Sequence, residues 1–65
     1  MDRFEPGDKV WIENIKYAEN VDMIRNIQTV EYVQDISCKD EPDAQMIFLV
    51  GSEFIYTNKD LRKDK

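Results

Sequence analysis

The segment 44–57 constrains the fold most, because two apolar stretches in it flank the pair Gly51-Ser52. Glycine followed by serine is typical of a two-residue type II′ turn, so the segment predicts a β-hairpin. This turn pairs Phe48 with Ile55, and a four-residue loop would keep the same pairs. The hairpin is therefore expected whichever loop connects its strands.

Both faces of this hairpin are apolar, whereas an antiparallel hairpin in water normally shows one polar face. Side chains alternate along a strand, which divides them into two sets. The first face carries Ile47, Leu49, Phe54 and Tyr56. The second face carries Met46, Phe48, Val50 and Ile55, with Glu53 and Thr57. One face can fill a core, and the other is then covered by the chain itself, by a second copy or by a partner. Met46, Phe48, Val50 and Ile55 are thus candidate partner-binding residues.

Three further strands are predicted outside the hairpin. The first runs over Lys9–Asn14, after a turn at 6–8, and the second over 29–37. Val30, Tyr32 and Ile36 share a face of the second strand, which Gln34 interrupts, so a bulge or strong bend is expected there. A turn at 57–61 precedes a short last strand over 61–65. Between the first two strands, the sequence favours a long loop over a short helical turn.

Trp11, the only tryptophan, shares its strand face with Lys9 and Glu13. Tryptophan on an exposed strand face can anchor a protein interface. Alternatively, Tyr17 or Met23 from the long loop covers it as a second small core, since tryptophans are usually well buried. Both interpretations stay open, and Trp11 is kept as a candidate partner-binding residue.

The charge of the chain is unevenly distributed. Its 65 residues carry a formal net charge of −5, which divides into −7 over residues 1–58 and +2 over the last seven. The acidic body disfavours nonspecific binding to phosphate backbones and suits a basic protein partner. The lysines of the tail are expected to keep an edge strand soluble, although they could touch phosphates.

Asp40, Glu41 and Asp43 form an acidic loop, which is a third candidate site. Carboxylates can bind Ca²⁺, but no EF-hand pattern accompanies these three, and a solvated loop is the simpler interpretation. The spread of acids along the chain leaves mimicry of a nucleic acid as a weaker alternative.

Several kinds of chemistry have no support in the sequence. The chain contains no histidine, the commonest general base and metal ligand at neutral pH. Neither a phosphate-cradling glycine loop nor a nucleophile–base pair is found, so no enzyme activity and no cofactor are predicted. The single cysteine, Cys38, suits a reducing cytoplasm. The absence of a long apolar run predicts no membrane span, and the N-terminus shows no secretory signal.

The chain resembles small SH3-like β-barrels of the KOW-type, Tudor-like and bacterial or phage accessory kinds. The resemblance rests on the opening "PGDKVWI" at 6–12, the ending "Y..KDL" at 56–61 and the rhythm of strands between them. It implies an all-β fold of about five antiparallel strands in one domain, residues 1–65. Such barrels commonly have a glycine before the second strand, and "MIRNIQTVEYV" has none, so a ligand role for that loop is not carried over.

The sequence favours a non-enzymatic protein-binding module, with a phage or bacterial accessory protein that inhibits a host factor as its specific form. A homodimer through the second hairpin face is a possible assembly. The alternative is a KOW- or Tudor-like domain associated with nucleic acid, or an acidic mimic of one. The acidic charge disfavours direct binding of nucleic acid.

Overall fold

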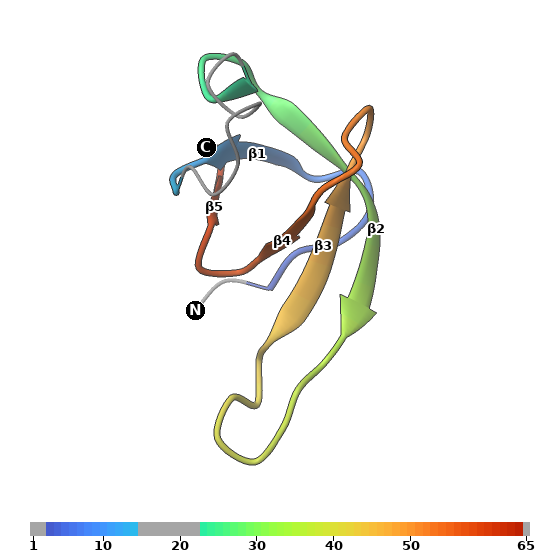
Figure 1. The fold of residues 1–65 in the computed structure, drawn as a ribbon, viewed down its shortest axis with the longest axis vertical. Helices are drawn as coiled ribbons and strands as arrows, with labels where there is room; N and C mark the ends of the chain where they lie inside the picture. Colours follow the sequence, from blue (N-terminus) through green and yellow to red (C-terminus); the bar gives the residue numbers. More distant parts are fainter. Residues whose placement is uncertain (1–2, 15–22, 65) are drawn as a thin grey trace.

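A computed structural model describes residues 3–14 and 23–64, which form a single five-stranded antiparallel sheet (Figure 1). The strands are β1 (Lys9–Ile12), β2 (Gln28–Asp35), β3 (Gln45–Leu49), β4 (Ile55–Thr57) and β5 (Leu61–Lys63). Their order across the sheet is β4-β3-β2-β1-β5, so the first strand lies between the second and the last. The all-β class and the five antiparallel strands are confirmed.

The sheet is strongly curved but does not close. Among the described residues, β4 and β5 form its two edges and do not pair with each other, so the predicted closure into a barrel is not found. Residues 15–22, which form most of the predicted long loop between the first two strands, lie outside the described residues. The part of this connection that is described forms a turn at 23–26, in which the Asn26 N–H donates to the Met23 carbonyl at 3.1 Å.

The core lies inside the curve of the sheet. Val10 and Ile12 alternate with Lys9 and Trp11 on β1, as predicted, and point into it. The predicted first face of the hairpin supplies half of the rest, namely Ile47, Leu49 and Tyr56, with Phe54 packed at its margin. Among the described residues, the buried members of the core cluster are Phe4, Val10, Ile12, Val30, Ile47, Leu49, Tyr56 and Leu61.

The hairpin of β3 and β4 has the predicted register but a different turn. Phe48 pairs with Ile55, as expected. The Ser52 N–H, however, donates to the Leu49 carbonyl at 3.1 Å, and Gly51 has a φ of +80°. Glycine is therefore the third residue of a turn over 49–52, the position at which type II turns need positive φ. The predicted type II′ turn with glycine second is wrong.

Two tight turns place the remaining strands. Before β1, the Asp8 N–H donates to the Glu5 carbonyl at 3.1 Å and Gly7 has a φ of +93°, which confirms the predicted turn. Before β5, Asp60 Oδ2 accepts from the Thr57 N–H at 2.9 Å and from its hydroxyl at 3.1 Å. β1 ends earlier than predicted because Glu13 and Asn14 both donate their N–H groups to the Asp60 carbonyl, which bends the chain toward this turn.

Within the described residues, no helix is long and apolar enough to cross a bilayer.

Candidate functional site

The outer face of the hairpin, directed away from the core, is apolar. Phe48 on β3 lies between Tyr32 on β2 and Ile55 on β4 in the strand register. The Tyr32 and Phe48 rings have their centroids 5.5 Å apart, tilted by 42°. We use the name outer face for the apolar side chains on this side of the sheet. They are Tyr32, Ile36, Met46, Phe48, Val50 and Ile55. The outer face contains all four hairpin residues that the sequence predicted as partner-binding.

A bulge in β2 brings Tyr32 to this face. Val30 pairs with Leu49 and Tyr32 with Phe48, so two steps on β2 match one step on β3. One extra residue reverses the facing of every side chain beyond it. Val30 consequently points into the core while Tyr32 points outward, and the prediction that they share a face is wrong. The predicted bulge exists, but near Glu31 rather than near Gln34.

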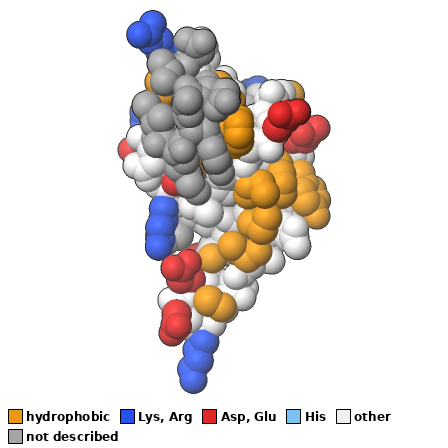
Figure 2. All heavy atoms as spheres, viewed as in Figure 1, with side chains coloured by type: hydrophobic (Ala, Val, Ile, Leu, Met, Phe, Trp, Pro, Cys, Tyr) orange, Lys and Arg blue, Asp and Glu red, His pale blue; other side chains and the backbone are white. Residues whose placement is uncertain are grey.

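Much of the outer face is accessible to solvent. Tyr32 is 54%, Val50 53%, Ile36 41% and Ile55 38% exposed, while Met46 and Phe48 are half-buried between their neighbours. Figure 2 shows hydrophobic side chains gathered into a continuous band over this part of the molecule, with acidic side chains close to its ends. A contiguous apolar surface of this kind usually marks an interaction site.

A small hollow joins the outer face to the acidic loop. It has a volume of about 120 Å³ and is lined by Ile36, Glu41, Ala44, Thr57, Asn58 and Lys59. A second hollow of about 310 Å³ adjoins it, because Glu41, Ala44 and Lys59 line both. Two of the predicted candidate sites, the second hairpin face and the acidic loop, thus form one continuous surface.

The acidic loop is partly neutralised by basic side chains of the same chain. Lys59 Nζ lies 3.3 Å from Glu41 Oε1, and Arg3 Nη1 lies 3.9 Å from Asp43 Oδ1. Both pairs are solvent-exposed, so they stabilise the fold by about 1 kcal/mol at most. No group of carboxylates able to hold a metal ion occurs in the described part of the chain.

Trp11 lies apart from this surface, on β1. Its Nε1–H donates to Asp64 Oδ1 at 2.9 Å, and the Arg62 guanidinium lies 5.8 Å from the centre of its ring. The side chain is half-buried. Met23, one of the residues expected to cover it, packs against the core cluster, and Tyr17 lies outside the described residues. The role of Trp11 as a partner anchor stays a prediction.

Removal of the Arg62 side chain should open one side of the Trp11 ring. We expect Arg62→Ala to raise the acrylamide quenching of tryptophan fluorescence while it lowers the free energy of unfolding by less than about 1 kcal/mol. Lys9→Ala removes a neighbouring cation on the same strand and should leave quenching unchanged. Equal quenching in both variants would show that other residues cover the ring.

The three basic side chains of the tail that the structure describes are paired with acids of the chain. Arg62 Nε lies 3.7 Å from Glu13 Oε2, and Lys63 Nζ lies 3.7 Å from Asp8 Oδ2. Lys59 is paired as described above. These pairs reduce the positive charge that the tail could offer to a phosphate backbone.

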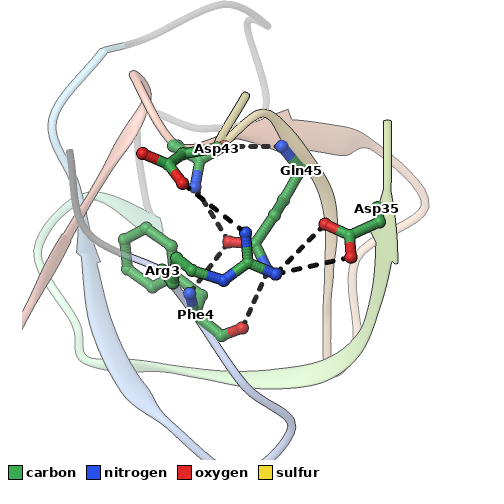
Figure 3. A network of polar contacts seen from close by, with 6 residues as sticks. Arg3, Phe4, Asp35, Asp43 and Gln45 are labelled. Carbon is green, nitrogen blue, oxygen red and sulfur yellow. Dashed lines mark hydrogen bonds and ion pairs between the residues drawn. The ribbon is translucent and has the colours of Figure 1, made fainter. Parts of the chain in front are cut away.

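The sequence did not point to Gln45 or Phe4. The buried Gln45 side chain ties the N-terminal arm, residues 3–5, to the sheet (Figure 3). Its Oε1 accepts from the Phe4 N–H at 2.9 Å and from Asn58 Nδ2 at 2.8 Å. Its Nε2 donates to the Phe4 carbonyl at 3.0 Å. Beside it, Arg3 Nη2 donates to both carboxylate oxygens of Asp35, at 3.1 and 3.4 Å. These hydrogen bonds attach the N-terminal arm to β2 and β3, on the side of the sheet opposite the outer face.

Comparison of the chain with models of protein families, with characterised proteins and with solved structures finds no match.

Proposed function

We propose that this protein is a non-enzymatic protein-binding module and that the outer face is its docking surface. The observation that carries the proposal is the continuity of Tyr32, Phe48 and Ile55 across three paired strands, on the side opposite the core. Aromatic side chains such as Tyr32 and Phe48 are enriched at the centres of protein interfaces, where a few buried anchors supply most of the binding energy.

The construction of the sheet supports this function. The inner side chains Ile47, Leu49 and Tyr56 are fully buried behind the outer face, so the surface is backed by packed core. A partner that binds to such a surface loses little free energy to the ordering of loops. Trp11 is not part of this surface, and it serves in the proposal only as a secondary contact.

We also propose that the fold is an open relative of the SH3-like barrels. The strand order β4-β3-β2-β1-β5 and the tight turn at 57–60 before β5 support this assignment. The small size and acidic charge suit an accessory protein that inhibits a host factor in a bacterial or phage system. These features also suit a site of action in the cytoplasm.

The proposal can be tested by site-specific photo-cross-linking in the cells that produce the protein. A photoreactive amino acid at Ile55 should give a defined protein adduct, and the same group at exposed Arg25 should not. The adduct should disappear when Phe48 is also changed to Ser, because the aromatic centre of the surface is lost. Equal labelling from both positions, or no adduct from Ile55, would contradict a docking role.

A further inference from the structure

We infer that the occupant of the outer face is a basic protein segment, in which apolar side chains are flanked by lysine or arginine. This inference rests on the proposed function and adds the chemistry of the partner. Its apolar residues would cover Tyr32, Phe48 and Ile55, and its basic residues would meet the carboxylates around them. Three observations support it: the acidic side chains around the face, the hollow beside Ile36, and the repulsion that two copies of this acidic surface would have for each other.

Acidic side chains predominate around the outer face. Five carboxylates adjoin it in the chain or lie in the loop beside its hollow: Glu31, Asp40, Glu41, Asp43 and Glu53. Three basic side chains, Arg3, Lys39 and Lys59, lie among them, which leaves a balance of −2. Within the described residues, Glu31, Asp40 and Glu53 have no ion-pair partner, so their charge is available to another molecule.

Two adjoining hollows lie beside the acidic loop, and Glu41 lines both of them. A cavity of roughly 150 Å³ is large enough for a benzene ring, so the hollow of about 310 Å³ can admit a side chain. Ile36 and Thr57 lead from the outer face into the smaller one. The Lys59–Glu41 pair at its margin is exposed and weak. A lysine or arginine of a partner can therefore take the place of Lys59 at Glu41, next to an apolar contact on Ile36.

The same charges disfavour a second copy of the chain as the occupant. A twofold interface brings the same surface of both copies together, so each acidic margin would face an identical one. Like charges opposed across an interface cost several kcal/mol, and the chain as a whole carries −5. The same repulsion disfavours a nucleic acid backbone on this face.

The experiment is a selection from a displayed library of random peptides against the full chain, repeated against the Phe48→Ser variant. We expect peptides that depend on Phe48 to combine aromatic or aliphatic residues with lysine or arginine. In solution, Phe48→Ser should weaken the binding of such a peptide about tenfold or more. Raising the salt concentration from about 0.05 to about 0.5 M should weaken binding to the original chain about threefold or more.

Matched variants separate the apolar contribution from the charge. The double change Glu31→Gln and Glu53→Gln should weaken binding about threefold or more, whereas Glu13→Gln, remote from the face, should not change it. Ile27→Ser removes an exposed apolar side chain outside the outer face and should also leave binding unchanged. If Phe48→Ser lowers Tm, Ile55→Ser replaces it, because Ile55 is already partly exposed.

The outcomes distinguish the inference from the proposed function. Peptides that depend on Phe48 but carry no excess of basic residues, and bind equally at high salt, would overturn the inference and keep the docking surface. A library without any Phe48-dependent binder would overturn both. Self-association of the chain that Phe48→Ser abolishes, measured by sedimentation, would show a second copy as the occupant and also overturn the inference.

Discussion

Replacement of Gln45 by alanine should lower the free energy of unfolding by about 3 kcal/mol or more. The change removes the Gln45 side chain as the partner of the Phe4 N–H and the Phe4 carbonyl, together with one hydrogen bond from Asn58 Nδ2. A buried polar group that loses its partner costs about 1–3 kcal/mol. A domain of 65 residues has a total stability of roughly 3–10 kcal/mol, so this loss is a large fraction of the free energy of unfolding.

Urea denaturation followed by Trp11 fluorescence measures this loss directly, since the tryptophan is unique. Gln34→Ala is the matched control. Gln34 is the same type of residue on the neighbouring strand, but its side chain is exposed. Its replacement should change stability by less than about 0.5 kcal/mol. If both variants unfold at the same urea concentration, the Gln45 network is not what holds the N-terminal arm.

Phe4→Ala should be nearly as damaging, with an expected loss of about 3–5 kcal/mol. The Phe4 side chain is only 2% exposed and belongs to the core cluster, although it lies outside every strand. Its removal leaves a cavity between the two halves of the curved sheet. The contact between its ring and Lys63 Nζ, 5.7 Å from the ring centre, is also lost.

Thermal unfolding by calorimetry or circular dichroism tests this second prediction. Arg3→Ala is the adjacent control, because its ion pairs with Asp35 and Asp43 are solvent-exposed. We expect that change to cost about 1 kcal/mol at most. Comparable losses in both variants would mean that the charges of the arm, rather than the burial of Phe4, fix it to the sheet.

The sequence predicted the elements of the fold that depend on local alternation. Val10 and Ile12 on β1, and Ile47 and Leu49 on β3, repeat at every second position and are buried as expected. The register of β3 with β4 was also predictable, since different connecting loops preserve the same pairs. The type of turn was not, because a glycine serves a type II or a type II′ turn at adjacent positions.

The features that sequence reasoning missed depend on distant contacts. Gln45 stands at an inward position of β3, where a polar residue looks like an interruption of the apolar pattern. Its partners Phe4 and Asn58 lie 41 and 13 residues away, and nothing in the pattern connects them. Phe4 was likewise overlooked because it precedes the first turn and has no strand periodicity.

The candidate site was predicted in its parts but not in its arrangement. The apolar set Met46, Phe48, Val50 and Ile55 followed from alternation alone, and its partial exposure agrees with that interpretation. The addition of Tyr32 could not be foreseen, because the position of a bulge decides its facing. The meeting of this face with the acidic loop depends on how the loop 36–44 folds back beside the turn at 57–60.

The order of the strands has a consequence for the synthesis of the protein. β1 lies between β2 and β5, and its residue Ile12 pairs with Leu61, 49 positions later. Contacts so far apart in the chain form slowly, because a long loop must close before they add stability. The ribosome makes the chain from its N-terminus, so Val10 and Ile12 are complete long before their partner strand exists. Until Leu61–Lys63 has been made, β1 therefore keeps an unpaired edge and the core lacks Leu61. A chain interrupted earlier exposes that edge to pairing with other chains.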